Sequence, residues 1–136
     1  MADFDLLGGS DAFYLNIQHD YSLIDLLQHS GHVTHDLWST VTADADGIDV
    51  LPAPEMPYID VIEQRKMNEV LEHARSTYDW TVVDLPCIFH RLSLLTVTEA
   101  DRAFLVSTSD LASLHLARRA VKVLTQIGMD SQKFQV

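Results

Sequence analysis

Short apolar runs alternate along the chain with segments in which apolar side chains recur at helical spacing. The apolar runs predict three strands, at residues 48–51, 80–84 and 103–106. The first is stopped by Pro52, and the other two are apolar almost throughout, as strands covered on both faces of a sheet are. Alternating strands and helices are typical of βα units. The pattern therefore predicts an α/β fold with a mostly parallel sheet flanked by helices.

Three helices are predicted before, between and after these strands. One is a surface helix with a buried stripe at helical spacing: Met67, Val70, Leu71 and Ala74. A second is predicted over residues 111–127, with Asp110 as its N-cap and Gly128 where a left-handed residue ends a helix. A short third helix, ending at Leu27, is opened by the capping pair Ser22 and Asp25. Residues 41–47 are predicted to be an acidic loop or a frayed helix end.

Several side chains that could suggest a functional site are better explained by a structural role. The spacing of His29, His32 and His35 would suit a metal site, but Gly31 and the polar surroundings favour a solvated connector. We expect Met67 and Trp80 to be core residues and Cys87 to be an inert, partly buried thiol. The basic residues Arg118, Arg119 and Lys122 are expected to form the solvated face of a packed helix.

Length, charge and cysteine content limit the classes of function. The 136 residues carry a net charge of −11, which opposes binding to nucleic acid or anionic lipid. No apolar run approaches the roughly 20 residues of a membrane span. No signal peptide is evident, and a single cysteine cannot form an internal disulfide. We therefore expect one cytoplasmic domain, residues 1–136, without an integral membrane segment or a nucleic-acid partner.

Candidate chemistry lies where strands end. Ligands of open α/β sheets bind beyond the carboxyl ends of the strands, where Asp84 lies, and Asp3 and Asp5 resemble the tail of a further strand. Carboxylates at one edge would hold Mg²⁺ through waters and position an attacking water. Alternatively, Asp84 caps a turn, and Asp3 and Asp5 belong to a disordered terminus. A G-x-x-x-x-G-K-[ST] loop, which would bind phosphates, is absent from the sequence.

The order of these features resembles the MinD/ParA class of deviant-Walker ATPases, and most closely its CpaE/TadZ branch, which serves Flp-type (tight-adherence) pilus assembly. Five segments carry the resemblance: Asp3-Phe-Asp5 with Gly9-Ser10-Asp11-Ala12 and Leu15, Tyr21 to Leu27, Gly47 to Pro54 in the manner of "GLxVLPAP", Tyr78 to Pro86, and Ala100-Asp101. Together they run through nearly the whole chain.

The resemblance implies roles for individual residues. Asp84 matches the Walker B aspartate that orders Mg²⁺ through water, Asp5 matches the carboxylate near the attacking water, and Asp3 is its neighbour. Leu85 and Pro86 would begin the switch segment that senses the γ-phosphate. The cofactors implied are Mg²⁺ and ATP.

The resemblance also implies that the chain is one partial P-loop NTPase domain. The family's Gly-rich loop would precede Met1, and the adenine-contacting part would follow Val136. We therefore expect the chain alone to bind and hydrolyse ATP poorly or not at all. An uncovered strand edge predicts homo-oligomers, and pilus or secretion assembly proteins are the expected partners. The alternative is a non-catalytic protein–protein interaction and localisation module.

Overall fold

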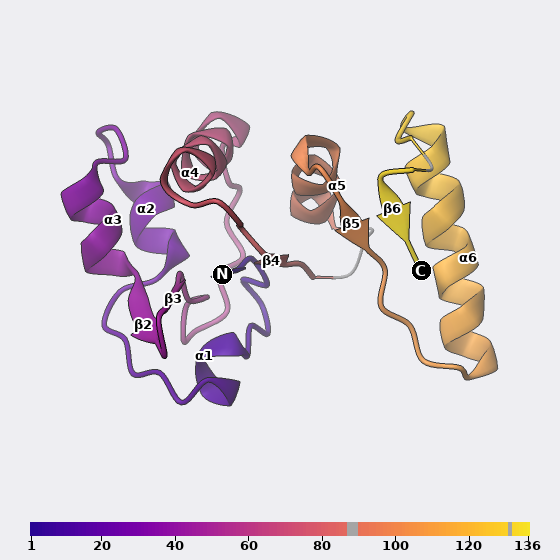
Figure 1. Ribbon diagram of the computed structural model, residues 1–136, viewed down its shortest axis with the longest axis horizontal. Helices are drawn as coiled ribbons and strands as arrows, with labels where there is room; N and C mark the ends of the chain where they lie inside the picture. The colour runs from indigo at the N-terminus through magenta and orange to yellow at the C-terminus, as the bar shows by residue number, and fades with distance from the viewer. Residues whose placement is uncertain (87–89, 131) are drawn as a thin grey trace. The chain divides into compact units, whose positions relative to one another are not determined.

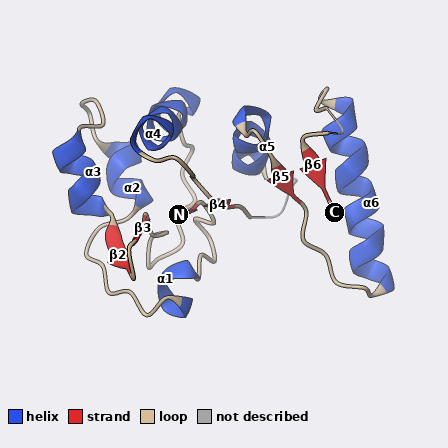
Figure 2. Cartoon of the chain, viewed as in Figure 1, coloured by secondary structure: helices blue, strands red, loops and turns tan. Residues whose placement is uncertain are grey.

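The computed structural model describes residues 1–86, 90–130 and 132–136. The chain forms two compact units, Met1–Pro86 and Cys87–Val136, called here the N-terminal and C-terminal units. Both contain helices and short strands (Figures 1 and 2). Cys87 lies outside the described residues, so its expected environment stays a prediction.

The N-terminal unit has a short parallel sheet with the chain's first residues at its centre. Its elements are β1 (Ala2–Asp3), α1 (Asp11–Tyr14), α2 (Leu23–Gln28), α3 (His35–Val41), β2 (Ala43–Ala45), β3 (Ile48–Val50), α4 (Gln64–Thr77) and β4 (Val83–Asp84). Strand β1 pairs in parallel with β4, and Ala2 forms a parallel bridge with Leu51 on the other side. The amide of Asp3 donates to the Leu51 carbonyl at 3.0 Å, and that of Phe4 donates to the Asp84 carbonyl at 2.9 Å.

The segment 48–51 contributes to two different pairings. Leu51 pairs in parallel with β1, as predicted, but β3 pairs antiparallel with β2. The prediction of a loop or frayed helix at 41–47 was therefore wrong. Asp46 and Gly47, with φ of 52° and 86°, form the two-residue turn of a hairpin. Asp-Gly favours this turn because both central residues need positive φ.

Helices α2, α3 and α4 cover the core of the N-terminal unit, with α2 in contact with both α3 and α4. The capping box of Ser22 and Asp25 is present and begins α2, as predicted. Helix α4 buries Met67, Val70 and Ala74. Other fully buried core residues are Phe4, Leu23, Leu26, Val50 and Leu51.

Trp80 is not a core residue, and that prediction was wrong. Its side chain is 87% exposed, and only the last two residues of the predicted strand 80–84 belong to β4. The pairing is short because β1, the partner strand, is itself two residues long. Apolar composition predicted a covered strand, but burial also needs elements that cover it.

The C-terminal unit contains α5 (Arg91–Glu99), β5 (Ala103–Phe104), α6 (Leu111–Gln126) and β6 (Phe134–Gln135). Strands β5 and β6 are parallel. Both predicted caps of α6 are confirmed: the Asp110 carboxylate accepts from the amides of Ala112 and Ser113, and Gly128 has φ of 82°. Arg118, Arg119 and Lys122 are exposed on α6, as expected. Among the described residues, no helix is both long enough and apolar enough to cross a membrane.

Candidate carboxylate site

The register of the parallel sheet brings two distant aspartates together. Asp3 ends β1, Asp84 ends β4, and the two are direct partners in the ladder. Asp11, the first residue of α1, joins them, and one carboxylate oxygen from each residue lies within 4.8 Å of the others. Asp3 is 1% exposed, Asp11 is partly buried and Asp84 is exposed. These three residues are called here the carboxylate cluster.

A tight turn between Asp3 and Asp11 holds the cluster in place. The Asp3 carboxylate accepts from the amide of Asp5 at 3.0 Å through Oδ1 and from the amide of Asp11 at 3.2 Å through Oδ2. The amide of Gly9 donates to the Asp5 carbonyl at 2.8 Å. Asp5 Oδ1 accepts from the amides of Leu7 and Gly8, both at 3.1 Å. The side chain of Asp5 thus stabilises the turn that presents Asp3 and Asp11.

Burial and nearby negative charges raise the pKa values of Asp3 and Asp11. The pKa of Asp11 is raised to about 6, mainly by burial and further by the negative charges of Asp3 and Asp84. Burial also raises the pKa of Asp3, against the opposing effect of the amides of Asp11 and Asp5. A bound cation would remove this repulsion, because opposite charge favours the ionised carboxylates.

The cluster fits a hard divalent cation. Asp11 Oδ2 is buried and has no hydrogen-bond partner among the described residues. A buried carboxylate oxygen without a donor is costly, so it calls for a ligand or a proton. Carboxylate oxygens are the ligands that Mg²⁺ and related cations take in proteins. Asp3, Asp11 and Asp84 are therefore the residues that would hold such an ion, directly or through water.

The sequence-predicted residues have different places in this arrangement. Asp3 and Asp84 belong to the carboxylate cluster. The Asp5 carboxylate instead accepts hydrogen bonds from backbone amides within the turn. Leu85 and Pro86 follow β4 and are half-buried, next to residues that lie outside the described part of the chain. Sequence reasoning gave no role to Asp11, although it is an aspartate eight positions after Asp3 within the segment that resembles the family.

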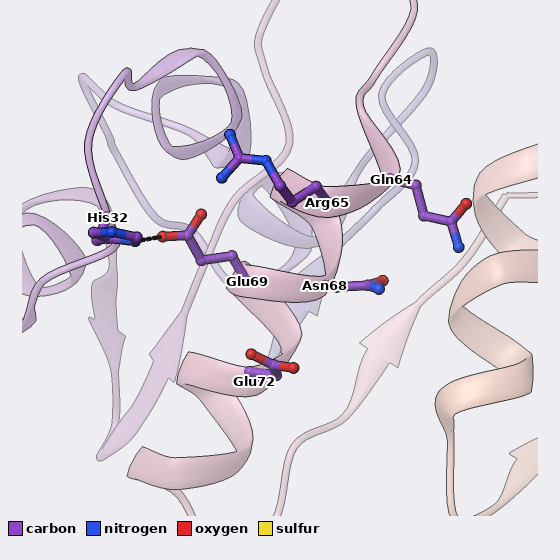
Figure 3. A pocket seen from close by; sticks show the side chains of 6 residues that line it. All are labelled: His32, Gln64, Arg65, Asn68, Glu69 and Glu72. Atoms are coloured by element: carbon purple, nitrogen blue, oxygen red, sulfur yellow. Dashed lines mark hydrogen bonds and ion pairs between the residues drawn. The ribbon is translucent and has the colours of Figure 1, made fainter.

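His29 and His32 lie in the exposed connector between α2 and α3, as predicted, but His35 is the exposed first residue of α3. The metal-ligand group found among the described residues contains none of the three. His32 Nδ1 lies 3.0 Å from Glu69 Oε1, and Lys66 Nζ donates to the Gly31 carbonyl at 2.6 Å. Figure 3 shows His32 pointing toward Glu69 of α4, and both side chains line an open groove. The groove is also lined by Gln64, Arg65, Asn68 and Glu72. These contacts fix the connector to α4.

Comparison with known proteins identifies the fold. No family model matches the chain, and no curated protein matches it either. Among solved structures, the chain is similar to the crystal structure of a ParA family ATPase from Chlorobium tepidum TLS, with a TM-score of 0.84 and 21% sequence identity. The similarity covers 98% of this chain and 57% of that one. The chain thus has a ParA-like α/β fold and spans a little over half the length of the ATPase that it matches.

Proposed function

We propose that the chain is the cation-organising part of a MinD/ParA-family ATPase of the CpaE/TadZ-like branch. The observation that carries this proposal is the parallel register that joins Asp3 to Asp84 and, through the turn, to Asp11. In a ParA-like fold, a group of carboxylates at the carboxyl ends of parallel strands is suited to Mg²⁺-dependent phosphate chemistry. The proposed setting is the cytoplasm, with pilus or secretion assembly proteins as partners.

The aspartates of the site and the two residues after β4 have different roles in this proposal. Asp84 orders the ion through water, and Asp3 and Asp11 complete the negative site. When bound, Mg²⁺ supplies positive charge that neutralises phosphate oxygens. Asp5 uses Oδ1 for the turn, and we assign the positioning of water to Oδ2. Leu85 and Pro86 begin the proposed switch segment.

The same proposal predicts little ATP binding by these 136 residues alone. The sequence has no phosphate-binding loop, and its net charge is −11. A carboxylate cluster repels a triphosphate unless a cation and backbone N–H groups offset the charge. We infer that a P-loop strand and loop outside this sequence complete the site. Coding sequence upstream of Met1 tests this point: an in-frame strand followed by K-G-G-x-G-K-[ST] is expected.

Cation binding is tested directly with the full 136-residue chain. Mn²⁺, a paramagnetic substitute for Mg²⁺, should broaden the amide NMR signals of Asp3 and Asp84 at low occupancy. Asp84→Ala should abolish the selective broadening. Asp60→Asn is the matched control, because Asp60 is an exposed aspartate outside the cluster, and it should change nothing. Equal broadening in Asp84→Ala would refute the assignment.

Nucleotide binding needs a separate titration. Calorimetry with Mg-ATP should give no saturable binding in the low micromolar range. Low-micromolar binding that is lost in Asp84→Ala would mean that the chain retains a working nucleotide site, which the proposal excludes.

A non-catalytic interaction module is the second candidate. The observation in its favour is the apolar surface near β4, where Trp80 is 87% and Val82 62% exposed. Under this alternative, the chain uses such surface to bind and localise assembly components without turnover. Full cation binding with no nucleotide site in the complete gene product would favour it.

A further inference from the structure

The turn between Asp3 and Asp11 leaves no room for a side chain at Gly9. A Cβ atom built on Gly9 would lie 2.3 Å from Ala53 Cβ, 2.6 Å from Asp3 Oδ2 and 2.8 Å from the Asp5 carbonyl oxygen. Favourable contacts between carbon atoms begin at about 3.5 Å. Gly9 does not have positive φ, so the requirement for glycine here comes from space and not from backbone conformation.

Two of the three close neighbours of Gly9 belong to the turn itself. Asp3 Oδ2 also accepts from the Asp11 amide, and the Asp5 carbonyl also accepts from the Gly9 amide. A side chain at position 9 would therefore push directly on the carboxylate of Asp3 and on the hydrogen bond that closes the turn. Ala53, the third neighbour, is 6% exposed and belongs to the core of the N-terminal unit.

We propose that Gly9 is a positioning residue of the carboxylate cluster: the missing side chain lets the turn close on Asp3 and so sets the distance between Asp3 and Asp11. Gly9 itself touches no cation. This proposal deepens the proposed function and rests on it for the cation, but the position of the Asp3 and Asp11 groups can be measured without one.

Gly8 provides a matched control for a substitution at Gly9. A Cβ on Gly8 would meet only Asp5 Oδ2, at an ordinary 3.6 Å. Gly9→Ala should move the amide NMR signals of Asp5 and Asp11 in the cation-free chain and weaken Mn²⁺ binding by about tenfold or more, as substitutions behind metal ligands do. Gly8→Ala should leave the signal of Asp11 and the Mn²⁺ affinity unchanged.

A compensating substitution separates positioning from general loss of stability. In Gly9→Ala/Ala53→Gly the 2.3 Å conflict disappears, while the contacts with Asp3 Oδ2 and the Asp5 carbonyl remain. The double variant should recover thermal stability but keep the shifted Asp11 amide and the weak Mn²⁺ binding. Recovery of both signals and affinity would overturn the proposal, as would a Gly9→Ala chain with an unmoved Asp11 amide.

The cation assignment and the positioning role of Gly9 can fail separately. If the original chain shows no selective Mn²⁺ broadening, the cation assignment fails. The amide signals of Asp5 and Asp11 in the same set of variants still decide whether Gly9 positions the two carboxyl groups.

Discussion

Asp11 is partly buried and has two negatively charged neighbours, and this combination predicts a raised carboxyl pKa that NMR can measure. Its pKa is raised from 3.8 to about 6 by burial first, then by Asp3 and Asp84. Carboxyl NMR signals of the cation-free chain should show Asp11 titrating near pH 6. Asp84→Asn removes one negative neighbour, so it should lower the midpoint. An unchanged midpoint would mean that Asp84 does not act on Asp11.

The same titration sets the sign of a stability change. Because the folded-state pKa of Asp11 lies above its unfolded value, the folded chain binds more protons between about pH 4 and pH 6. The contribution of Asp11 to the free energy of unfolding is therefore full below about pH 4 and is lost as pH rises through 6. Urea unfolding at several pH values should show a shallower loss over this window in Asp11→Asn than in the original chain.

Tyr78 links a buried indole to a carboxylate. Trp38 Nε1 donates to the Tyr78 hydroxyl at 2.8 Å, and that hydroxyl donates to Asp49 Oδ2 at 2.6 Å. Tyr78→Phe leaves the indole N–H of the buried Trp38 without this acceptor, so the free energy of unfolding should fall by about 1–2 kcal/mol. Tyr14→Phe is the control, because Tyr14 is 78% exposed. Equal urea midpoints for the two variants would refute the argument.

At the residue level, the sequence predicted the two site residues that lie at the ends of strands. Asp3 and Asp84 were found because residues at the ends of parallel strands meet at one edge. Gly9 and Asp11 were named only as part of a family-like segment and were given no role, because their contacts arise from closure of an irregular turn, which has no periodic pattern. Trp80 was misassigned because composition does not tell whether a covering element is present.

At the level of elements, local signals predicted helices better than strands. The Ser22–Asp25 capping box, the Asp110 cap and Gly128 all act within a few residues, so sequence alone located α2 and α6. The parallel pairing of Leu51 with β1 joins segments far apart in the sequence, so residues 48–51 carried no sign of it. The β2–β3 hairpin is local, and its Asp46-Gly47 turn was interpreted only as part of a loop or frayed helix end.

Helix α4 holds the histidine connector through Glu69, which gives a prediction for this element. Glu69 Oε1 accepts from the Val33 amide at 3.0 Å, and Oε2 lies 3.5 Å from the buried Lys66 ammonium. The Val33 amide is the main cause of the lowered pKa of Glu69. Glu69→Gln removes the negative charge that pairs with the Lys66 ammonium, so it should lower the free energy of unfolding by about 1 kcal/mol. Its effect should shrink as pH falls and the carboxylate is protonated.

Glu72 is a suitable control for that substitution. It lies on the same helix and is exposed, so Glu72→Gln should change the free energy of unfolding little. A stability loss of equal size in Glu69→Gln and Glu72→Gln would indicate an effect of net charge and not of the contacts with Val33 and Lys66.

For the whole molecule, the α/β class followed from alternating patterns, and the resemblance to MinD/ParA proteins agrees with the ParA-like fold. Branch, pilus role and ATP dependence are properties of the complete site and its partners, and they stay proposals. A fold fixes where strands end. It does not fix what binds there, because phosphate binding depends on a loop that this sequence does not contain.

The strand edges predict how whole molecules associate. The Ala2 amide donates to the Val82 carbonyl and the Phe4 amide to the Asp84 carbonyl, both at 2.9 Å. Since bonding direction alternates along a strand, the backbone groups of Val83 face away from β1. Within the described part of the N-terminal unit no other strand pairs there, and exposed Val82 adjoins that edge. An open apolar edge tends to pair with another chain. We therefore expect homodimers or larger species that form without nucleotide.

Light scattering over a concentration series, with and without Mg-ATP, measures this association. Mass should rise with concentration and should not respond to Mg-ATP. Val82→Lys should shift the series toward monomer, because a lysine at a strand edge opposes pairing. Val61→Lys is the control, since Val61 is 83% exposed and precedes α4 outside any strand. A monomer at all concentrations would refute edge pairing. A dimer formed only with Mg-ATP would instead indicate a nucleotide-dependent interface and a working enzyme.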